Sequence, residues 1–220
     1  MTVAMATDHN ERSMPISHMT PIVFVIDDDI SVRESLEALI RYEGLQVETF
    51  VSAEEFLKRP RAAGPSCLIL DVSLPDLNGL ALQERLADRA DMPIIFITGF
   101  GDVPMTVQAM KAGAVEFLTK PFADTVLLEA IKGALERSRT AFAQETKVGE
   151  LRENYASLSS REREVMALVV SGLMNKQVGA QLGISEITVK AHRGSVMRKM
   201  KANSLADLVN MAATLNLTRP

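Results

Sequence analysis

The sequence predicts an α/β flavodoxin-like domain, a doubly wound five-stranded parallel sheet, followed by a small all-α helix-turn-helix domain. Two observations predict the first part: short apolar runs recur between residues 21 and 139, and helical patterns separate them. A third predicts the second part, because residues after 157 keep helical periodicity without a strand pattern. A chain of 220 residues has room for two ordinary domains.

The expected strands are short and rich in β-branched and aromatic residues. They lie near 22–26, 46–50, 67–70, 94–97 and 115–118. Helix signals fall between them: Ser52 and Glu55 form a capping box, and Asp102 with Pro104 opens a helix that Gly113 ends. This alternation favours parallel strands covered by helices on both faces.

Serine caps also divide the C-terminal region into helices. The expected helices run from Ser159 to near Gly172, from about Asn175 to Leu182, from Ser185 to about Met200, and onward from Ser204. The tight turn Leu182-Gly183-Ile184 joins the second and third of these into a helix-turn-helix.

We expect four parts along the chain: a disordered leader over 1–20, the α/β domain over 21–139, a linker over 140–156, and the helical domain over 157–220. The polar linker could prolong the preceding helix or be flexible. No apolar run is long enough for a membrane span, and the leader lacks the apolar stretch of a signal peptide. We therefore expect a cytoplasmic protein with no membrane partner. The single cysteine excludes an internal disulfide and a cysteine-based metal site.

The charge is unevenly distributed between the two halves. Residues 1–156 carry 15 basic and 24 acidic side chains, a net charge of −9. Residues 157–220 carry 9 basic and 4 acidic side chains, a net charge of +5. This asymmetry indicates a nucleic-acid-binding module beside an acidic one, although ordinary surface charge on two domains is the alternative.

Polar residues follow the predicted strands at their carboxyl ends. Asp27 and Asp28 follow the first strand, Asp71 the third, Thr98 the fourth and Lys120 the last. Ligands of open parallel sheets bind beyond these ends, so the five side chains should converge. Two carboxylates suffice for Mg²⁺, which leaves Asp71 as a nucleophile for a phosphoryl group. Each residue taken alone would more often be structural.

On these five positions, residues 21–139 resemble the receiver domain of two-component response regulators. The stretch TGFGDVPMTVQAMKAGAVEF, residues 98–117, is similar to the FixJ-type branch of that family. The resemblance implies Mg²⁺-dependent transfer of a phosphoryl group from a histidine kinase to Asp71. It also assigns the metal ligands Asp27, Asp28, Asp71 and the Ser73 carbonyl, and the switch residues Thr98, Phe117 and Lys120, the last followed by a cis peptide bond to Pro121.

The helix from Ser185 should pack its apolar residues Val189, Val196 and Met200 inward. A basic stripe should face outward, formed by Lys190, Arg193, Gly194, Met197 and Lys201. Such a helix reads base edges in the major groove, and Lys190 and Arg193 are the candidates for guanine contacts. Lys176, Arg198 and Lys199 are candidate phosphate contacts. A solvated charged helix face is the alternative.

Residues 157–214 resemble the LuxR-type four-helix DNA-binding domain. The matching motifs are LSSREREV from Leu158, NKQVG from Asn175 and ITVKAHR from Ile187. Thr188 and His192 therefore join the candidate DNA contacts. The resemblance also implies that the last helix dimerises, with candidates Leu205, Leu208, Val209 and Met211.

The two resemblances together predict a transcription factor, not an enzyme, that phosphorylation of Asp71 activates and that dimerises on promoter DNA. RNA polymerase is a further candidate partner. Two alternatives stay open. One is a metal-dependent phosphatase with Asp71 as nucleophile, although Ser73 stands where such an enzyme often has its acid. The other is a phosphorylation-independent DNA-binding regulator that uses the receiver as a dimerisation scaffold.

Overall fold

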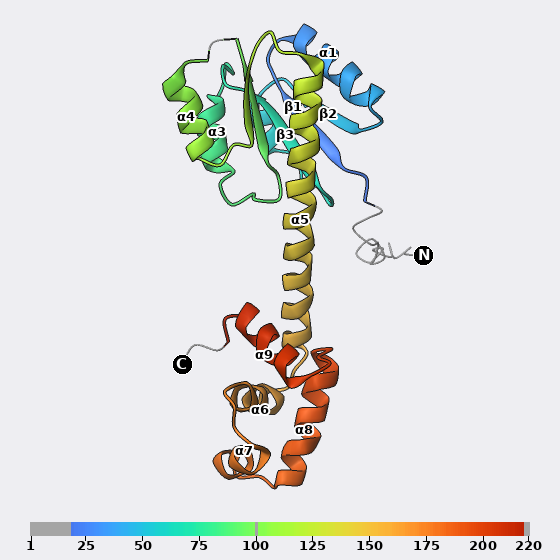
Figure 1. The fold of residues 1–220 in the computed structure, drawn as a ribbon, viewed down its shortest axis with the longest axis vertical. Coiled ribbons are helices and arrows are strands. Elements are labelled where there is room, and N and C mark those ends of the chain that lie inside the picture. The colour runs from blue at the N-terminus through green and yellow to red at the C-terminus, as the bar shows by residue number, and fades with distance from the viewer. Residues whose placement is uncertain (1–18, 100, 218–220) are drawn as a thin grey trace, which may run out of the picture. The chain divides into compact units, whose positions relative to one another are not determined.

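The computed structural model describes residues 19–99 and 101–217 (Figure 1). The chain divides into two compact units, Met1–Ala143 and Gln144–Pro220, and each is described by itself. Most of the predicted leader, residues 1–18, lies outside the described residues. Within the described residues, the longest helix is too polar to cross a membrane and the others are too short or too polar as well.

A five-stranded parallel sheet forms the centre of the first unit, as predicted. The strands are β1 (Ile22–Ile26), β2 (Gln46–Phe50), β3 (Ser66–Asp71), β4 (Ile94–Thr98) and β5 (Glu116–Thr119). Their order in the sheet is β2-β1-β3-β4-β5. The chain therefore reverses its direction of winding between β1 and β3, and the crevice beyond their carboxyl ends is the binding position of such sheets.

Helices cover both faces of this sheet (Figure 1). They are α1 (Ile30–Tyr42), α2 (Ala53–Leu57), α3 (Gly79–Arg85), α4 (Val103–Lys111) and α5 (Asp124–Ala156). Alternate strand residues point to opposite faces. Val25 and Ile69 pack with α1 and α5, whereas Phe24 and Leu70 pack with α2, α3 and α4.

Two helices of this unit, α2 and α4, begin at the predicted caps, whereas Asp29 caps α1 and Asn78 caps α3. The Ser52 hydroxyl accepts a hydrogen bond from the Glu55 amide, and the Glu55 carboxylate accepts one from the Val51 amide. Asp102 caps α4 through the Met105 amide at 2.8 Å. Gly113 follows α4 with a φ of 95°, a conformation that glycine adopts without steric cost.

The second unit is helical and has its own apolar core. It holds α6 (Ser160–Val170), α7 (Asn175–Leu182), α8 (Glu186–Lys199) and α9 (Leu205–Thr214). Val165, Val189 and Leu208 are buried at the centre of this core. The predicted linker, residues 140–156, is helical throughout as part of α5, and its Leu151 and Tyr155 pack against the same core.

Candidate functional site

Three carboxylates meet at the carboxyl edge of the sheet, beyond the neighbouring strands β1 and β3. Asp27 and Asp28 follow β1, and Asp71 ends β3. Each offers one oxygen, and these oxygens lie within 4.8 Å of one another. Asp27 and Asp71 are buried, whereas Asp28 is exposed to solvent. The parallel register of the strands thus brings together residues that are 43 or 44 positions apart.

Lys120 joins the two buried carboxylates. Its Nζ donates to Asp27 Oδ2 at 2.6 Å and to Asp71 Oδ2 at 2.8 Å. The Lys120 amide donates to the Thr98 carbonyl at 2.8 Å, which holds the start of this loop on β4. The bond to Pro121 is cis, as the resemblance implied. One ammonium is therefore placed between the proposed phosphoryl acceptor and a proposed metal ligand.

Backbone amides fix the other oxygen of each buried carboxylate. The Asp29 amide donates to Asp27 Oδ1 at 2.9 Å, and the Ser73 amide donates to Asp71 Oδ1 at 2.9 Å. The Arg33 guanidinium donates to the Asp27 carbonyl at 2.6 Å and lies beside the site. The two amide bonds orient the carboxylates before any ligand arrives.

Burial and hydrogen bonding shift the pKa values of Asp27 and Lys120 in opposite directions. Burial raises the pKa of Asp27, and the hydrogen bonds from Lys120 and from the Asp29 amide offset this only in part. Burial alone would lower the pKa of Lys120, but its hydrogen bonds to Asp27 and Asp71 outweigh burial and raise it. The ammonium is thus kept charged near neutral pH.

The donor set suits a hard divalent cation. Three carboxylates within reach of one another offer the oxygen ligands that Mg²⁺ prefers, and the exposed Asp28 leaves one side open to water. Ser73, predicted to offer its carbonyl, is the exposed second residue after Asp71. The residues present therefore fit a magnesium ion.

Of the predicted switch residues, Thr98 ends β4, Phe117 lies on β5 and Lys120 directly follows β5. Thr98 is fully buried, and the half-buried Phe117 ring packs 6.0 Å from the Phe96 ring, measured between centroids. Gly101 passes close to both: a Cβ there would lie 3.0 Å from Phe117 Cε1 and 3.4 Å from Thr98 Cγ2. Glycine lets this loop lie directly over the switch residues.

A second close approach occurs beside the backbone of Asp71 and Val72. A Cβ on Gly79 would lie 2.5 Å from the Asp71 carbonyl oxygen and 3.0 Å from the Val72 Cα. The first residue of α3 must therefore be glycine for the chain to pass so near Asp71. Sequence reasoning missed this position because a glycine at a helix start has several ordinary explanations.

In the second unit, α7 and α8 form the predicted helix-turn-helix. Gly183 ends α7 with a φ of 67°, and Ser185 caps α8 through the Thr188 amide at 3.1 Å. A Cβ on Gly179 would lie 2.7 Å from the Ile184 carbonyl oxygen, so glycine permits the tight turn. The turn fixes how the two helices pack against each other.

The structure corrects the predicted outward stripe of α8. Lys190, Gly194 and Lys201 are exposed, but Arg193 and Met197 are half-buried. Arg193 donates to Asn175 Oδ1 of α7 at 3.2 Å, and Met197 packs against the apolar core. The reason is geometric, because these two residues border the face on which Val189 and Val196 are buried.

The remaining candidate DNA contacts also divide by exposure. Lys176 and Arg198 are exposed, whereas Thr188, His192 and Lys199 are half-buried. The Thr188 hydroxyl lies 2.8 Å from the hydroxyl of Ser185, and Lys199 pairs with Glu162 at 2.7 Å. Lys199 and Thr188 thus have partners within the domain. Besides Arg198, the exposed residues of α8 that the predicted stripe omitted are Glu186, Ile187 and Ala191.

Both domains of the chain match known protein families. Residues 23–132 match the response regulator receiver domain, and residues 156–212 match the bacterial regulatory proteins of the luxR family. Nodulation protein W of Bradyrhizobium diazoefficiens is 54% identical over 198 residues, 90% of this chain and 87% of that protein. Transcriptional regulatory protein FixJ of Rhizobium meliloti is 45% identical over 191 residues, 86% and 94% of the two chains. The chain belongs to the FixJ-type response regulators.

Solved structures support the same family. The response regulator StyR is 47% identical, with a TM-score of 0.77 over 89% of this chain and 99% of that one. Full-length FixJ from B. japonicum is 39% identical, with a TM-score of 0.52 over 90% and 98%. A receiver domain implies a histidine kinase as partner, and a LuxR-type domain implies DNA binding. This response regulator is therefore a transcriptional regulator.

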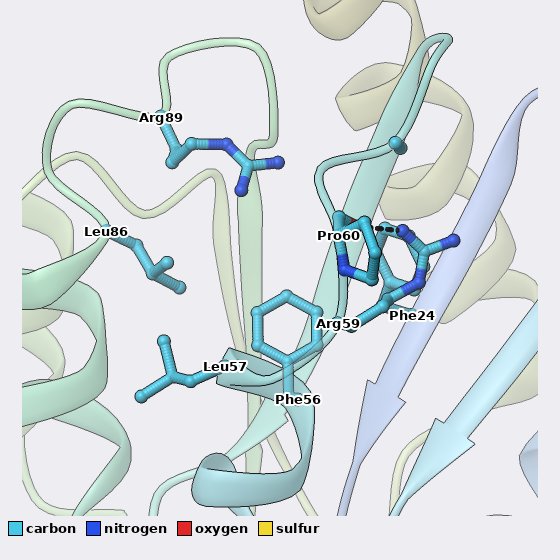
Figure 2. Close-up of a pocket in the computed structure, with 8 residues that line it drawn as sticks. Phe24, Phe56, Leu57, Arg59, Pro60, Leu86 and Arg89 are labelled. Carbon is cyan, nitrogen blue, oxygen red and sulfur yellow. Dashed lines mark hydrogen bonds between the residues drawn. The ribbon is translucent and has the colours of Figure 1, made fainter. Parts of the chain in front are cut away.

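One further hollow of the response regulator lies on the face of the sheet that packs with α2 and α3 (Figure 2). It has a volume of about 50 Å³ between Phe24, Phe56 and Leu86. Arg59 and Arg89 lie at its rim, but Arg59 pairs with Glu48 and Arg89 with Asp91. Both guanidinium groups thus have acidic partners beside the hollow, and the carboxylates at the carboxyl edge of the sheet are the candidate functional site.

Proposed function

We propose that a histidine kinase phosphorylates this response regulator on Asp71 with Mg²⁺, and that the phosphorylated chain dimerises and binds promoter DNA. Residues 21–139 would carry the phosphoryl chemistry and residues 157–220 the DNA binding. RNA polymerase would then be the partner of the DNA-bound form. The observation that supports this most is the position of Lys120, whose ammonium bridges the Asp27 and Asp71 carboxylates.

The transfer needs positioning and electrostatics from this chain. An Asp71 oxygen attacks phosphorus, a P–O bond forms, and the P–N bond to the kinase histidine breaks with its electron pair returning to the imidazole. Asp27, Asp28 and Asp71 would hold Mg²⁺, which supplies positive charge against the transferred oxygens. Lys120 supplies a second positive charge, and the Ser73 amide holds the acceptor carboxylate in place.

The added charge would act on the switch residues. A phosphoryl group on Asp71 offers new acceptor oxygens to the Thr98 hydroxyl at the end of the neighbouring strand. Movement of Thr98 would open space for Phe117, which packs beside Gly101 in the same region. Phosphorylation shifts the population only as far as it stabilises one arrangement over the other.

The outward face of α4 provides an apolar surface for dimerisation. Val103 is 76% exposed, Val107 45% and Met110 42%, and their spacing places them on one side of the helix. Large apolar side chains gathered on one exposed helix face are typical of an interaction surface. The buried Ala109 faces the other way, into the core.

The test is the intact mass of the chain after incubation with Mg²⁺ and a small phosphodonor. We expect the mass of one phosphoryl group on the wild type and none on Asp71→Asn, whose amide cannot accept it. An equal gain in mass on the two proteins would contradict the proposal, and no gain on the wild type would favour the phosphorylation-independent regulator. Continuous turnover of small phosphoesters would favour the phosphatase.

A further inference from the structure

The outward face of α8 combines apolar, small and basic residues. Ile187, Lys190, Ala191, Gly194 and Arg198 follow one another at helical spacing, and all five are exposed. Val189 and Val196 are buried on the opposite face. The outward face therefore has an apolar side chain in its first turn and no side chain at all at Gly194.

Ile187 is the feature of this face that the fold does not explain. It is 80% exposed, although isoleucine favours burial and packing inside this domain. It is the second residue of α8, in the first turn after the Ser185 cap, where a helix in the major groove presents side chains to bases. Ala191 is one turn further along on the same side.

We infer that Ile187 and Ala191 read thymine by packing against its C5-methyl group, and that Gly194 lets α8 approach the bases closely. This inference rests on the proposed binding of α8 in the major groove. The thymine methyl is the one apolar group that base pairs present there, so apolar side chains on this face select thymine. A Cβ on Gly194 would meet no protein atom within 4 Å, so no contact within the domain requires glycine there and the helix surface is open at this position.

The charges beside these residues identify the occupant as duplex DNA. Lys190 and Arg198 are exposed on the same face, where Lys190 also pairs with the exposed Glu186 of the first turn at 3.4 Å, and Lys176 is exposed on α7. Residues 157–220 carry a net charge of +5. Basic side chains around an apolar centre fit the major groove of DNA, which has phosphates along its edges and the thymine methyl group on its floor.

The test begins with duplexes that the full-length chain, treated with Mg²⁺ and phosphodonor, selects from a random pool. In a selected duplex, each thymine is replaced singly by deoxyuridine, which keeps base pairing and removes only the methyl group. We expect one or two replacements in each half-site to weaken wild-type binding about fourfold, the factor for about 0.8 kcal/mol of one buried methyl-sized group.

The variants separate direct contact from a structural role. At one of these thymine positions, Ile187→Ala should bind the thymine duplex and the deoxyuridine duplex equally well. Helix α8 of this variant should form as well as in the wild type or better, because alanine favours helices. Ile187→Val keeps an apolar branched side chain and should retain most of the discrimination. Gly194→Ala should weaken binding to both duplexes.

Two results would overturn the inference in different ways. If Ile187→Ala discriminates between the thymine and deoxyuridine duplexes as strongly as the wild type does, Ile187 does not touch the methyl group. The proposed DNA binding would not be affected by this result. Failure of the wild-type chain to select any duplex would overturn the proposed DNA binding and the methyl contact together.

Discussion

Two helical glycines of the DNA-binding domain have opposite surroundings. Gly179 lies in α7, where a Cβ would come within 2.7 Å of the Ile184 carbonyl oxygen. Gly194 lies in α8, where a Cβ would have no protein atom within 4 Å. The same substitution should therefore have opposite effects on stability at the two positions.

Gly194→Ala should raise the free energy of unfolding of the helical unit by about 0.5–1 kcal/mol, because it removes the backbone entropy of a mid-helix glycine. Gly179→Ala should lower it by about 1–3 kcal/mol, because the methyl group forces the turn to shift. Urea unfolding of the full chain, followed by hydrogen exchange of α7 and α8 amides, measures both. Effects of the same sign at both positions would contradict this account.

Glu162 gives the helical unit a predictable response to acid. Its carboxylate accepts hydrogen bonds from Lys199 Nζ at 2.7 Å and from the Ser159 amide at 2.7 Å. These two bonds lower the pKa of Glu162 from 4.5 to about 2. Between these values the unfolded chain binds a proton that the folded chain does not, so stability falls as the pH falls.

We therefore expect the contribution of Glu162 to the free energy of unfolding to be constant above about pH 5, where Glu162 is ionised in both states, and to decrease between pH 4.5 and about 2. Glu162→Gln should be less stable at pH 6 and should lose this part of the pH dependence. Glu150→Gln, on the exposed part of α5, controls for the loss of one negative charge. A wild-type pH profile in Glu162→Gln would contradict the prediction.

Among the elements, the short helix α2 depends on a residue from a distant loop. Asp76 follows Asp71 in the β3–α3 loop and accepts hydrogen bonds from the Glu54 amide at 2.9 Å and the Ala53 amide at 3.4 Å. Backbone hydrogen bonds lower the pKa of Asp76 against the opposing effect of burial. The loop after Asp71 thus helps to begin α2.

Asp76→Ala should lower the free energy of unfolding by about 1 kcal/mol, the usual contribution of a helix cap. The loss should be local, because Ser52 still caps the Glu55 amide. Hydrogen exchange should become faster at Ala53 and Glu54 and stay unchanged in β1. Unchanged exchange at Glu54 would show that the bond from Asp76 does not hold α2.

The strands and the helix starts could be predicted because their signals lie in short stretches of sequence. The five strands lie within one residue of their predicted bounds, and Ser52, Asp102 and Ser159 cap helices through their own neighbours. Tertiary pairs were not predictable in this way. The Asp76 bond to α2 and the Arg193 bond to Asn175 join residues 22 and 18 positions apart, and no periodicity marks either pair.

The acidic site could be predicted from the sequence, whereas the exposed face of α8 could be predicted only in part. Asp27, Asp71 and Lys120 follow strands, and the rule for parallel sheets brings strand ends together whatever the details of packing. Exposure around α8 depends instead on a rotation of the helix by a fraction of a turn. That rotation separates Ile187, which is exposed, from Arg193, which is half-buried.

At the scale of the molecule, each unit has an apolar core of its own. Phosphorylation of Asp71 can therefore raise DNA affinity without repacking the helical unit, provided that it brings two chains together. Two linked DNA-binding domains reach a two-fold site with an avidity of about 10²–10⁴ over one domain. The face of α4 is where this coupling should be interrupted.

Val107→Asp places a charge at the centre of that face, which should prevent dimerisation because a carboxylate would have to be buried against apolar side chains. The variant should gain one phosphoryl group as the wild type does but remain a monomer in analytical ultracentrifugation. Its affinity for a two-fold DNA site should be at least about tenfold below that of the phosphorylated wild type.

Tyr42→Asp is the matched control, because Tyr42 is 88% exposed on α1, which covers the other face of the sheet. Dimerisation of phosphorylated Val107→Asp at wild-type concentrations would exclude α4 as the interface, whereas a monomeric phosphorylated wild type would exclude dimerisation as the means of activation.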